Sequence, residues 1–388
     1  MTNKDRHAFV ATAISVFSAK IIPLVISMYL VLRMDVYSYA NWMYLFQYSL
    51  VVASGLGSVL NTEYSKRYEP LNYKERFISI FIGDRDLKIA LATVFILFIL
   101  QHDFEWYLSA LSVLLSALII INNYLLNSLR FRQEYGTLVF FSVLRLFGFG
   151  TIFFISQITL LSLFIVMIFS LLLPVIFILS FYNIELIKYR SNVESLFLLI
   201  YGFSTSLFIS FERFYLKGSG FNAVEYSSVM YVVTIAMLVS PIIEVIKQFL
   251  VPELYRKYRL DNFTLFNDKK ILFFVAVMIL FQLLLPYFVL MTLNELNKLP
   301  AFLSGPIDVS LFQISIGLAF YNLYHIMNPV YFINADSNKL LLFQLLGLLL
   351  FVAMINSNVN VYYSKSLVLM FVPICLFIYR YKSFINFE

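Results

Sequence analysis

Charged side chains interrupt two long apolar stretches in the first half of the sequence. Lys20 stands midway along the stretch 8–32, three residues before Pro23, and Arg145 stands near the middle of 137–156. A charge at such depth in a membrane is costly and normally faces a cavity or a partner of opposite charge. We expect both cations to line a wet cavity and to bind an anionic group such as a pyrophosphate. The alternatives are a buried ion pair or a side chain that extends to the water interface.

A second set of charges lies in the second half of the sequence. Glu212 and Arg213 end an apolar stretch near its predicted outer side, where they either line the cavity or solvate the end of the stretch. Glu244 and Lys247 can pair at i, i+3 on a helix, and both are candidates for the same cavity. Lys247 can also extend to water. We expect Lys365, near one end of the last apolar stretch, to extend to the interface.

The sequence lacks the residue patterns of enzymes. Its three histidines are scattered at positions 7, 102 and 325, and it has no HExxH motif, no glycine-rich phosphate loop and no spaced carboxylate cluster. Those patterns supply metal ligands and phosphate cradles. We therefore expect a protein that is not an enzyme, holds no metal and carries no cofactor.

The composition indicates what must position these charges. Of the 388 residues, 61% are hydrophobic and 13% are charged, whereas soluble domains carry about 25% charged residues. A soluble fold of this size cannot hide so much apolar surface, so the surrounding solvent is expected to be lipid. The apolar stretches are continuous rather than alternating, which selects membrane-spanning helices over a β-barrel. The net charge of +6 lies mainly in short loops and indicates no nucleic-acid partner.

About twelve stretches are long enough to cross a bilayer, for which a helix needs about 20 residues. The third stretch is the shortest, and an earlier start within 77–83 would lengthen it. The predicted spans of this all-α membrane protein are 8–32, 40–60, 87–101, 106–128, 137–156, 158–182, 195–216, 224–250, 271–293, 309–333, 339–358 and 361–380.

The distribution of Lys and Arg predicts the orientation, because cytoplasmic loops carry the excess of basic residues. With the N-terminus inside, 20 of the 28 basic residues lie in cytoplasmic segments or at the span ends beside them, and 4 lie in or beside external segments. We therefore expect both termini in the cytoplasm.

The chain divides at a predicted cytoplasmic linker, 183–194. Six spans precede it, giving an N-terminal bundle at 1–182, and six follow, giving a C-terminal bundle at 195–388. The longest cytoplasmic loop follows the second span in each half, at 61–86 and at 251–270. This spacing favours two repeated six-helix bundles around a central cavity, an arrangement in which transporters place their substrate between the halves.

The first 67 residues contain a set of short motifs. Lys20 lies within the first span, and Leu-Val-Leu-Arg covers 30–33. Tyr-Ser-Tyr-Ala covers 37–40, and Ser-Gly-Leu-Gly covers 54–57, shortly before Arg67.

A second set of motifs lies in 204–254, where Glu212-Arg213 is followed by Ala-Val-Glu-Tyr-Ser and then by Pro-Glu-Leu. Together the two sets resemble the polysaccharide-transport branch of the multidrug/oligosaccharidyl-lipid/polysaccharide (MOP) flippase superfamily, and most closely the O-antigen flippases. Ala40, Glu212 and Glu225 stand where that family more often has glycine, aspartate and glycine.

The resemblance implies a flippase of the bacterial inner membrane. Its substrate would be an undecaprenyl-pyrophosphate-linked sugar repeat unit, moved by alternating access from the cytoplasmic to the periplasmic leaflet for O-antigen and lipopolysaccharide biosynthesis. The implied partners are this lipid, the membrane and other proteins of surface-polysaccharide assembly. In that family cavity-facing basic residues meet the pyrophosphate, and Lys20 lies in the corresponding region.

Two alternatives remain open. An O-antigen polymerase or related membrane glycosyltransferase would need a large external loop, whereas the longest external stretch here, 294–308, is about 15 residues long. A small-molecule exporter related to multidrug transporters would carry acidic rather than basic residues deep in its N-terminal half.

Overall fold

A computed structural model describes most of the chain as two compact units. The first unit comprises Met1–Ile22 and Arg33–Ser210, and the second comprises Pro23–Leu32 and Phe211–Glu388. The predicted division at 183–194 stays a prediction. The residues whose structure is described are 3–67, 77–83, 104–132, 134–189, 193–245, 269–300, 303, 307–333 and 337–385.

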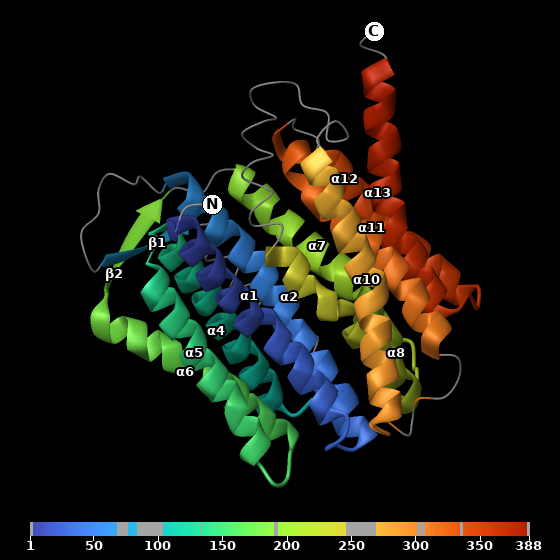
Figure 1. Ribbon diagram of the computed structural model, residues 1–388, viewed down its shortest axis with the longest axis horizontal. Helices are drawn as coiled ribbons and strands as arrows, with labels where there is room; N and C mark the ends of the chain where they lie inside the picture. Colours follow the sequence, from blue (N-terminus) through green and yellow to red (C-terminus); the bar gives the residue numbers. More distant parts are fainter. Residues whose placement is uncertain are drawn as a thin grey trace. The chain divides into compact units, whose positions relative to one another are not determined.

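Long α-helices build the first unit. Continuous apolar sequence in lipid leaves the backbone no partner except itself, and the α-helix satisfies every internal N–H and C=O. Figure 1 shows these helices in colours from blue to green. They are α1 (Asn3–Leu30), α2 (Val36–Arg67), α4 (Trp106–Phe131), α5 (Tyr135–Gly150) with the 3-10 helix η1 (Thr151–Phe154), α6 (Leu160–Phe181) and α7 (Val193–Gly218), of which α1 and α7 contribute residues to both units.

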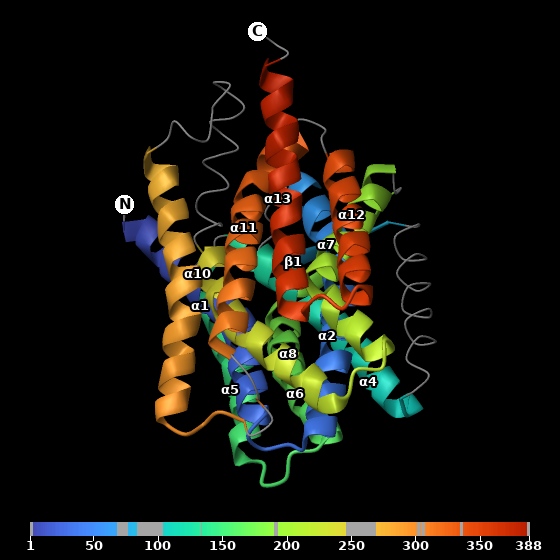
Figure 2. The ribbon, with the colours of Figure 1, turned by 90° about the vertical axis from the view of Figure 1, so that its right-hand side faces the viewer.

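The second unit is also helical. Figure 2 shows the axes of α10, α11, α12 and α13 roughly parallel to one another, and α13 packs against both α11 and α12. The helices are α8 (Ala223–Ala236) with the 3-10 helix η2 (Met237–Val239), α10 (Lys269–Glu295), α11 (Ile307–Ile333), α12 (Ser337–Asn356) and α13 (Val361–Ile385).

These helices confirm the predicted helical membrane fold. Each lies where a span was predicted; the sixth span, predicted at 158–182, is α6 at Leu160–Phe181. Among the described residues, six helical segments are long and apolar enough to cross a bilayer, and shorter apolar helices lie within α11, α12 and α13. The predicted count of twelve spans is confirmed in part, because the third, at 87–101, lies outside the described residues.

Two short strands depart from the expected all-helical chain. β1 (Phe77–Gly83) pairs in parallel with β2 (Asn183–Tyr189), and Figure 1 shows them side by side. The suggested start of the third span within 77–83 is therefore wrong. The sequence Phe-Ile-Ser-Ile-Phe-Ile-Gly is rich in β-branched and aromatic residues, which favour strands, and a short apolar run does not by itself distinguish a strand from a helix. The predicted linker 183–194 thus contains a strand.

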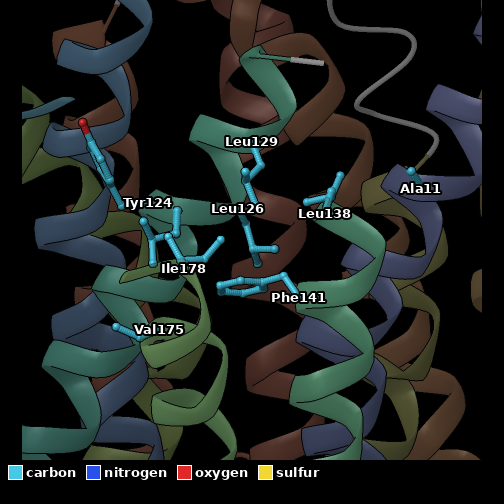
Figure 3. Close-up of a cluster of buried hydrophobic side chains, with 9 residues drawn as sticks. Ala11, Tyr124, Leu126, Leu129, Leu138, Phe141, Val175 and Ile178 are labelled. Atoms are coloured by element: carbon cyan, nitrogen blue, oxygen red, sulfur yellow. The ribbon is translucent and has the colours of Figure 1, made fainter. Parts of the chain in front are cut away.

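A buried apolar cluster joins four helices of the first unit. It combines side chains of α4, α5 and α6 with one residue of α1 (Figure 3). Lipid tails are as apolar as these side chains, so close van der Waals packing, rather than escape from water, holds such helices together. The members are Ala11, Tyr124, Leu125, Leu126, Leu129, Leu138, Phe141, Val175 and Ile178.

Small residues and side-chain amides join the helices of the first unit. A Cβ added to Gly148 of α5 would lie 2.4 Å from the Cα of Ser170 on α6, so only glycine fits this contact. At the next residue of α6, the Leu171 carbonyl accepts a hydrogen bond from Asn122 Nδ2 of α4 at 2.8 Å. Small residues that let backbones approach, and hydrogen bonds between helices, are characteristic of membrane bundles.

We predict that Gly148→Ala destabilises the folded protein by about 1–3 kcal/mol, because added volume in a packed contact forces the helices apart. Thermal unfolding of the purified protein in detergent, followed by circular dichroism, would show the change as a lower Tm. Gly136→Ala is the matched control, since a Cβ at Gly136 meets nothing within 4 Å. This control should unfold at or slightly above the wild-type temperature, because alanine is the better helix former. A Gly148→Ala variant with the wild-type Tm would contradict the packing described.

Candidate functional site

Three ionised side chains meet in the second unit, and we call them the charge cluster. Lys365 Nζ on α13 donates to Glu212 Oε2 on α7 at 2.5 Å. Arg213 Nε lies 3.7 Å from the other carboxylate oxygen, Glu212 Oε1. The sequence singled out Glu212 and Arg213, and the structure adds Lys365 as the residue in closest contact with the carboxylate.

All three side chains of the charge cluster are buried. The Glu212 side chain is 0% exposed, and those of Lys365 and Arg213 are 4% and 6% exposed. Opposite charges attract strongly where the surroundings have a low dielectric constant, and a buried charge without a partner is very costly. The three groups carry two positive charges and one negative charge. The cluster is therefore an ion pair joined by a second cation.

Helix packing holds Lys365 on an inner face of α13. Asn360 Oδ1 accepts a hydrogen bond from Tyr362 N at 2.9 Å and caps the start of the helix, so Lys365 lies in its second turn. The neighbouring residue Ser366 contacts α11 so closely that a Cβ on Gly317 would lie 2.7 Å from the Ser366 Cα. The expectation that Lys365 extends to the interface is therefore wrong. Its partner lies on a helix 153 positions away in sequence, and no local pattern reveals such a pair.

A break in α8 lies next to the charge cluster. The regular helix ends at Ala236 and continues as η2, where Arg213 Nη2 contacts the sulfur of Met237 at 3.7 Å. Gln282 of α10 donates from Nε2 to the Ala236 carbonyl at 2.8 Å, and Asn322 of α11 donates from Nδ2 to Gln282 Oε1 at 3.0 Å. Side-chain amides thus satisfy the carbonyl at the end of the regular helix. Stretches of 3-10 helix within a longer helix often mark hinges at functional sites.

Arg145 is the buried charged residue in the described part of the first unit. The residue is 4% exposed on α5, and its guanidinium carbon lies 5.6 Å from the centre of the Phe149 ring. Among the described residues, none accepts a hydrogen bond from Arg145 Nε or Nη1. Leu138 and Phe141, which share the buried face of α5 with Arg145, belong to the apolar cluster with α4 and α6. A cation is therefore held in apolar surroundings with an aromatic ring as its neighbour.

Three further residues belong to the predicted site. Lys20 is exposed on α1, in the part of the helix that belongs to the first unit. Glu244 is half-buried on the helical segment that follows η2 and reaches Val245. Lys247 lies outside the described residues. A cavity role for these three residues, as for the rest of the predicted site, stays a prediction.

Comparison with known proteins gives no relative by sequence but several by structure. No protein-family model and no curated protein matches the chain. A crystal structure of MATE in complex with MaD3S matches with a TM-score of 0.60 at 13% identity, covering 96% of this chain and 94% of that one. A MATE structure in complex with Br-NRF matches at 0.56 and 13% identity, covering 98% and 97%. The chain has the MATE fold.

A third solved structure relates the MATE fold to the predicted superfamily. It is an outward-facing multidrug resistance MATE family transporter of the MOP superfamily, with a TM-score of 0.56, 12% identity and coverage of 94% of this chain and 92% of that one. The fold of this chain is therefore also the fold of a transporter of that superfamily. It does not distinguish the O-antigen branch, because a fold alone does not identify a substrate.

We predict that Lys365→Met destabilises the protein, though by less than the about 3–5 kcal/mol of a fully uncompensated buried charge, because Glu212 loses its closest cation while Arg213 stays 3.7 Å away. The double variant Lys365→Met with Glu212→Gln should be closer to wild type than the single variant, since it removes both charges. Thermal unfolding in detergent would measure the three Tm values. Lys298→Met removes an exposed lysine and serves as the control with unchanged Tm. A double variant that unfolds at a lower Tm than Lys365→Met would contradict the ion pair.

Proposed function

We propose that this protein is a flippase that carries an oligosaccharide linked to undecaprenyl pyrophosphate, the O-antigen repeat unit, across a bacterial inner membrane. The MATE fold of a multi-pass membrane protein supports transport by alternating access. In this proposal both termini lie in the cytoplasm, as the distribution of Lys and Arg indicates. The substrate moves from the cytoplasmic to the periplasmic leaflet while its lipid tail stays in the bilayer.

The proposal rests on the sign of the buried charges. Of the charged residues that the structure describes as buried, Arg145, Arg213 and Lys365 are basic and Glu212 is acidic. A pyrophosphate that leaves bulk water needs its negative charge matched by the protein. Arginine and lysine side chains are the groups that supply this match through charge-assisted hydrogen bonds. An excess of buried cations therefore supports an anionic substrate.

A small-molecule exporter is the second candidate, and the solved neighbours favour it. One of them is described as a multidrug resistance transporter. An exporter of that kind would be expected to carry acidic groups deep in its N-terminal half. In the described part of the first unit the buried charged residue is Arg145 instead. The site thus favours the flippase, although both proteins would share the fold.

The test is a deletion strain complemented with wild-type, Lys20→Ala or Arg145→Ala genes, followed by analysis of lipid-linked intermediates and surface glycan. We expect the deletion to accumulate single repeat units on undecaprenyl pyrophosphate at the cytoplasmic side and to lose surface polymer. Lys20→Ala and Arg145→Ala should fail to restore the polymer at normal protein level, because each removes a cation that meets the pyrophosphate. Lys298→Ala, which removes an exposed lysine, should restore it.

Two other outcomes of the same experiment would contradict the flippase. Single repeat units that reach the surface without being polymerised would identify a polymerase. Normal surface glycan together with new sensitivity to organic cations would identify a small-molecule exporter.

A further inference from the structure

Glu212 is held unequally by the two cations of the charge cluster. Its Oε2 accepts a hydrogen bond from Lys365 Nζ at 2.5 Å, whereas Oε1 lies 3.7 Å from Arg213 Nε, beyond hydrogen-bonding distance. Among the described residues, no donor forms a hydrogen bond with Oε1. The Glu212 carboxylate therefore forms a hydrogen bond with Lys365 and lies near Arg213 without a hydrogen bond to its Nε.

A carboxylate and a phosphate make the same kind of contact with a lysine. Both are oxyanions that accept short, charge-assisted hydrogen bonds from an ammonium group. The lysine ammonium is a compact charge with three N–H donors and no fixed plane. It can therefore bind one oxyanion in place of another with little change in geometry. Lys365 can therefore bind either Glu212 or an anion from outside the protein.

The position of Arg213 makes such an exchange physically reasonable. A buried carboxylate that loses its cation is strongly destabilised unless another cation replaces it. Arg213 follows Glu212 directly on α7 and already lies 3.7 Å from the carboxylate. The charge of Glu212 can thus pass from Lys365 to Arg213 without being left alone in apolar surroundings.

We propose that Glu212 is a resident counter-anion of Lys365, displaced by the anionic group of the transported lipid and displacing that group again when the lipid leaves. This inference rests on the proposed function, since the incoming anion is the pyrophosphate of the substrate. In the predicted orientation Glu212 and Lys365 lie near the outer ends of α7 and α13, where the substrate is released. A carboxylate that restores its own ion pair there competes with the bound pyrophosphate and lowers its affinity at the release side.

The proposal is tested by ligand binding to the purified full-length protein in lipid nanodiscs. The probe is geranylgeranyl pyrophosphate, and geranylgeraniol is the matched ligand without the anion. Because Glu212 competes with the probe, Glu212→Gln should bind the pyrophosphate at least about fivefold more tightly than wild type, a coupling typical of linked sites. Lys365→Gln should bind it at least about fivefold more weakly, and adding Glu212→Gln to Lys365→Gln should not restore binding.

Two further variants keep the test decisive. Glu212→Asp retains the charge but shortens the side chain, so it should also bind the pyrophosphate more tightly than wild type, even if Glu212→Gln does not fold. Glu225→Gln removes an exposed carboxylate at the start of α8 and should bind as wild type does.

The proposal is overturned if Glu212→Gln and Glu212→Asp bind the pyrophosphate as wild type does, or more weakly, since Glu212 then does not compete. It is equally overturned if wild type binds pyrophosphate and alcohol alike, because the cluster then does not recognise the anion. Either result leaves the flippase function standing, provided that the deletion strain accumulates lipid-linked repeat units. Failure of that phenotype would instead reject the function itself.

Discussion

A bilayer offers no hydrogen-bond partner to a polar group, and this constraint governs the structure from its backbone to its charges. The backbone responds by forming helices over nearly every described apolar stretch. Where α8 leaves regular helical geometry, Gln282 supplies a hydrogen bond to the Ala236 carbonyl, and Asn322 in turn binds Gln282. A buried carboxylate also needs a partner within the protein, and the partner of Glu212 is Lys365. These polar residues thus come in connected sets, each joining different helices.

The positions of the helices could be predicted from the sequence because they depend on local properties. Continuous apolar composition and the thickness of the bilayer set the length of each span, so α6 and α13 lie where the predicted spans do. β1 was not predicted, because a mostly apolar run of seven residues fits a strand or part of a helix equally well until a partner strand is known. That partner, β2, comes later in the chain than β1, after α4, α5, η1 and α6.

The charged site was predictable only in part, for a related reason. The place of Arg145 within an apolar stretch, and of Glu212 and Arg213 at the end of another, marks them as candidates, and the structure describes all three as buried. The contact of Glu212 with Lys365 depends instead on how α7 and α13 pack, and sequence spacing carries no signal of that packing. Lys365 was therefore assigned to the interface on its own position in the last span. A lysine near a helix end reaches water only if no carboxylate on a neighbouring helix is closer.

The pairing of β1 with β2 has a consequence for how the protein is made. Phe77 pairs with Asn183, more than one hundred positions later, so β1 leaves the ribosome long before its partner exists. At typical rates of synthesis this delay is roughly 5–20 s, during which α4, α5 and α6 are inserted. An isolated strand has no stable structure of its own, and parallel pairing cannot form through a tight hairpin. The sheet is therefore a late step in the biogenesis of the first unit, because it cannot form before residues 77–189 have all been synthesised.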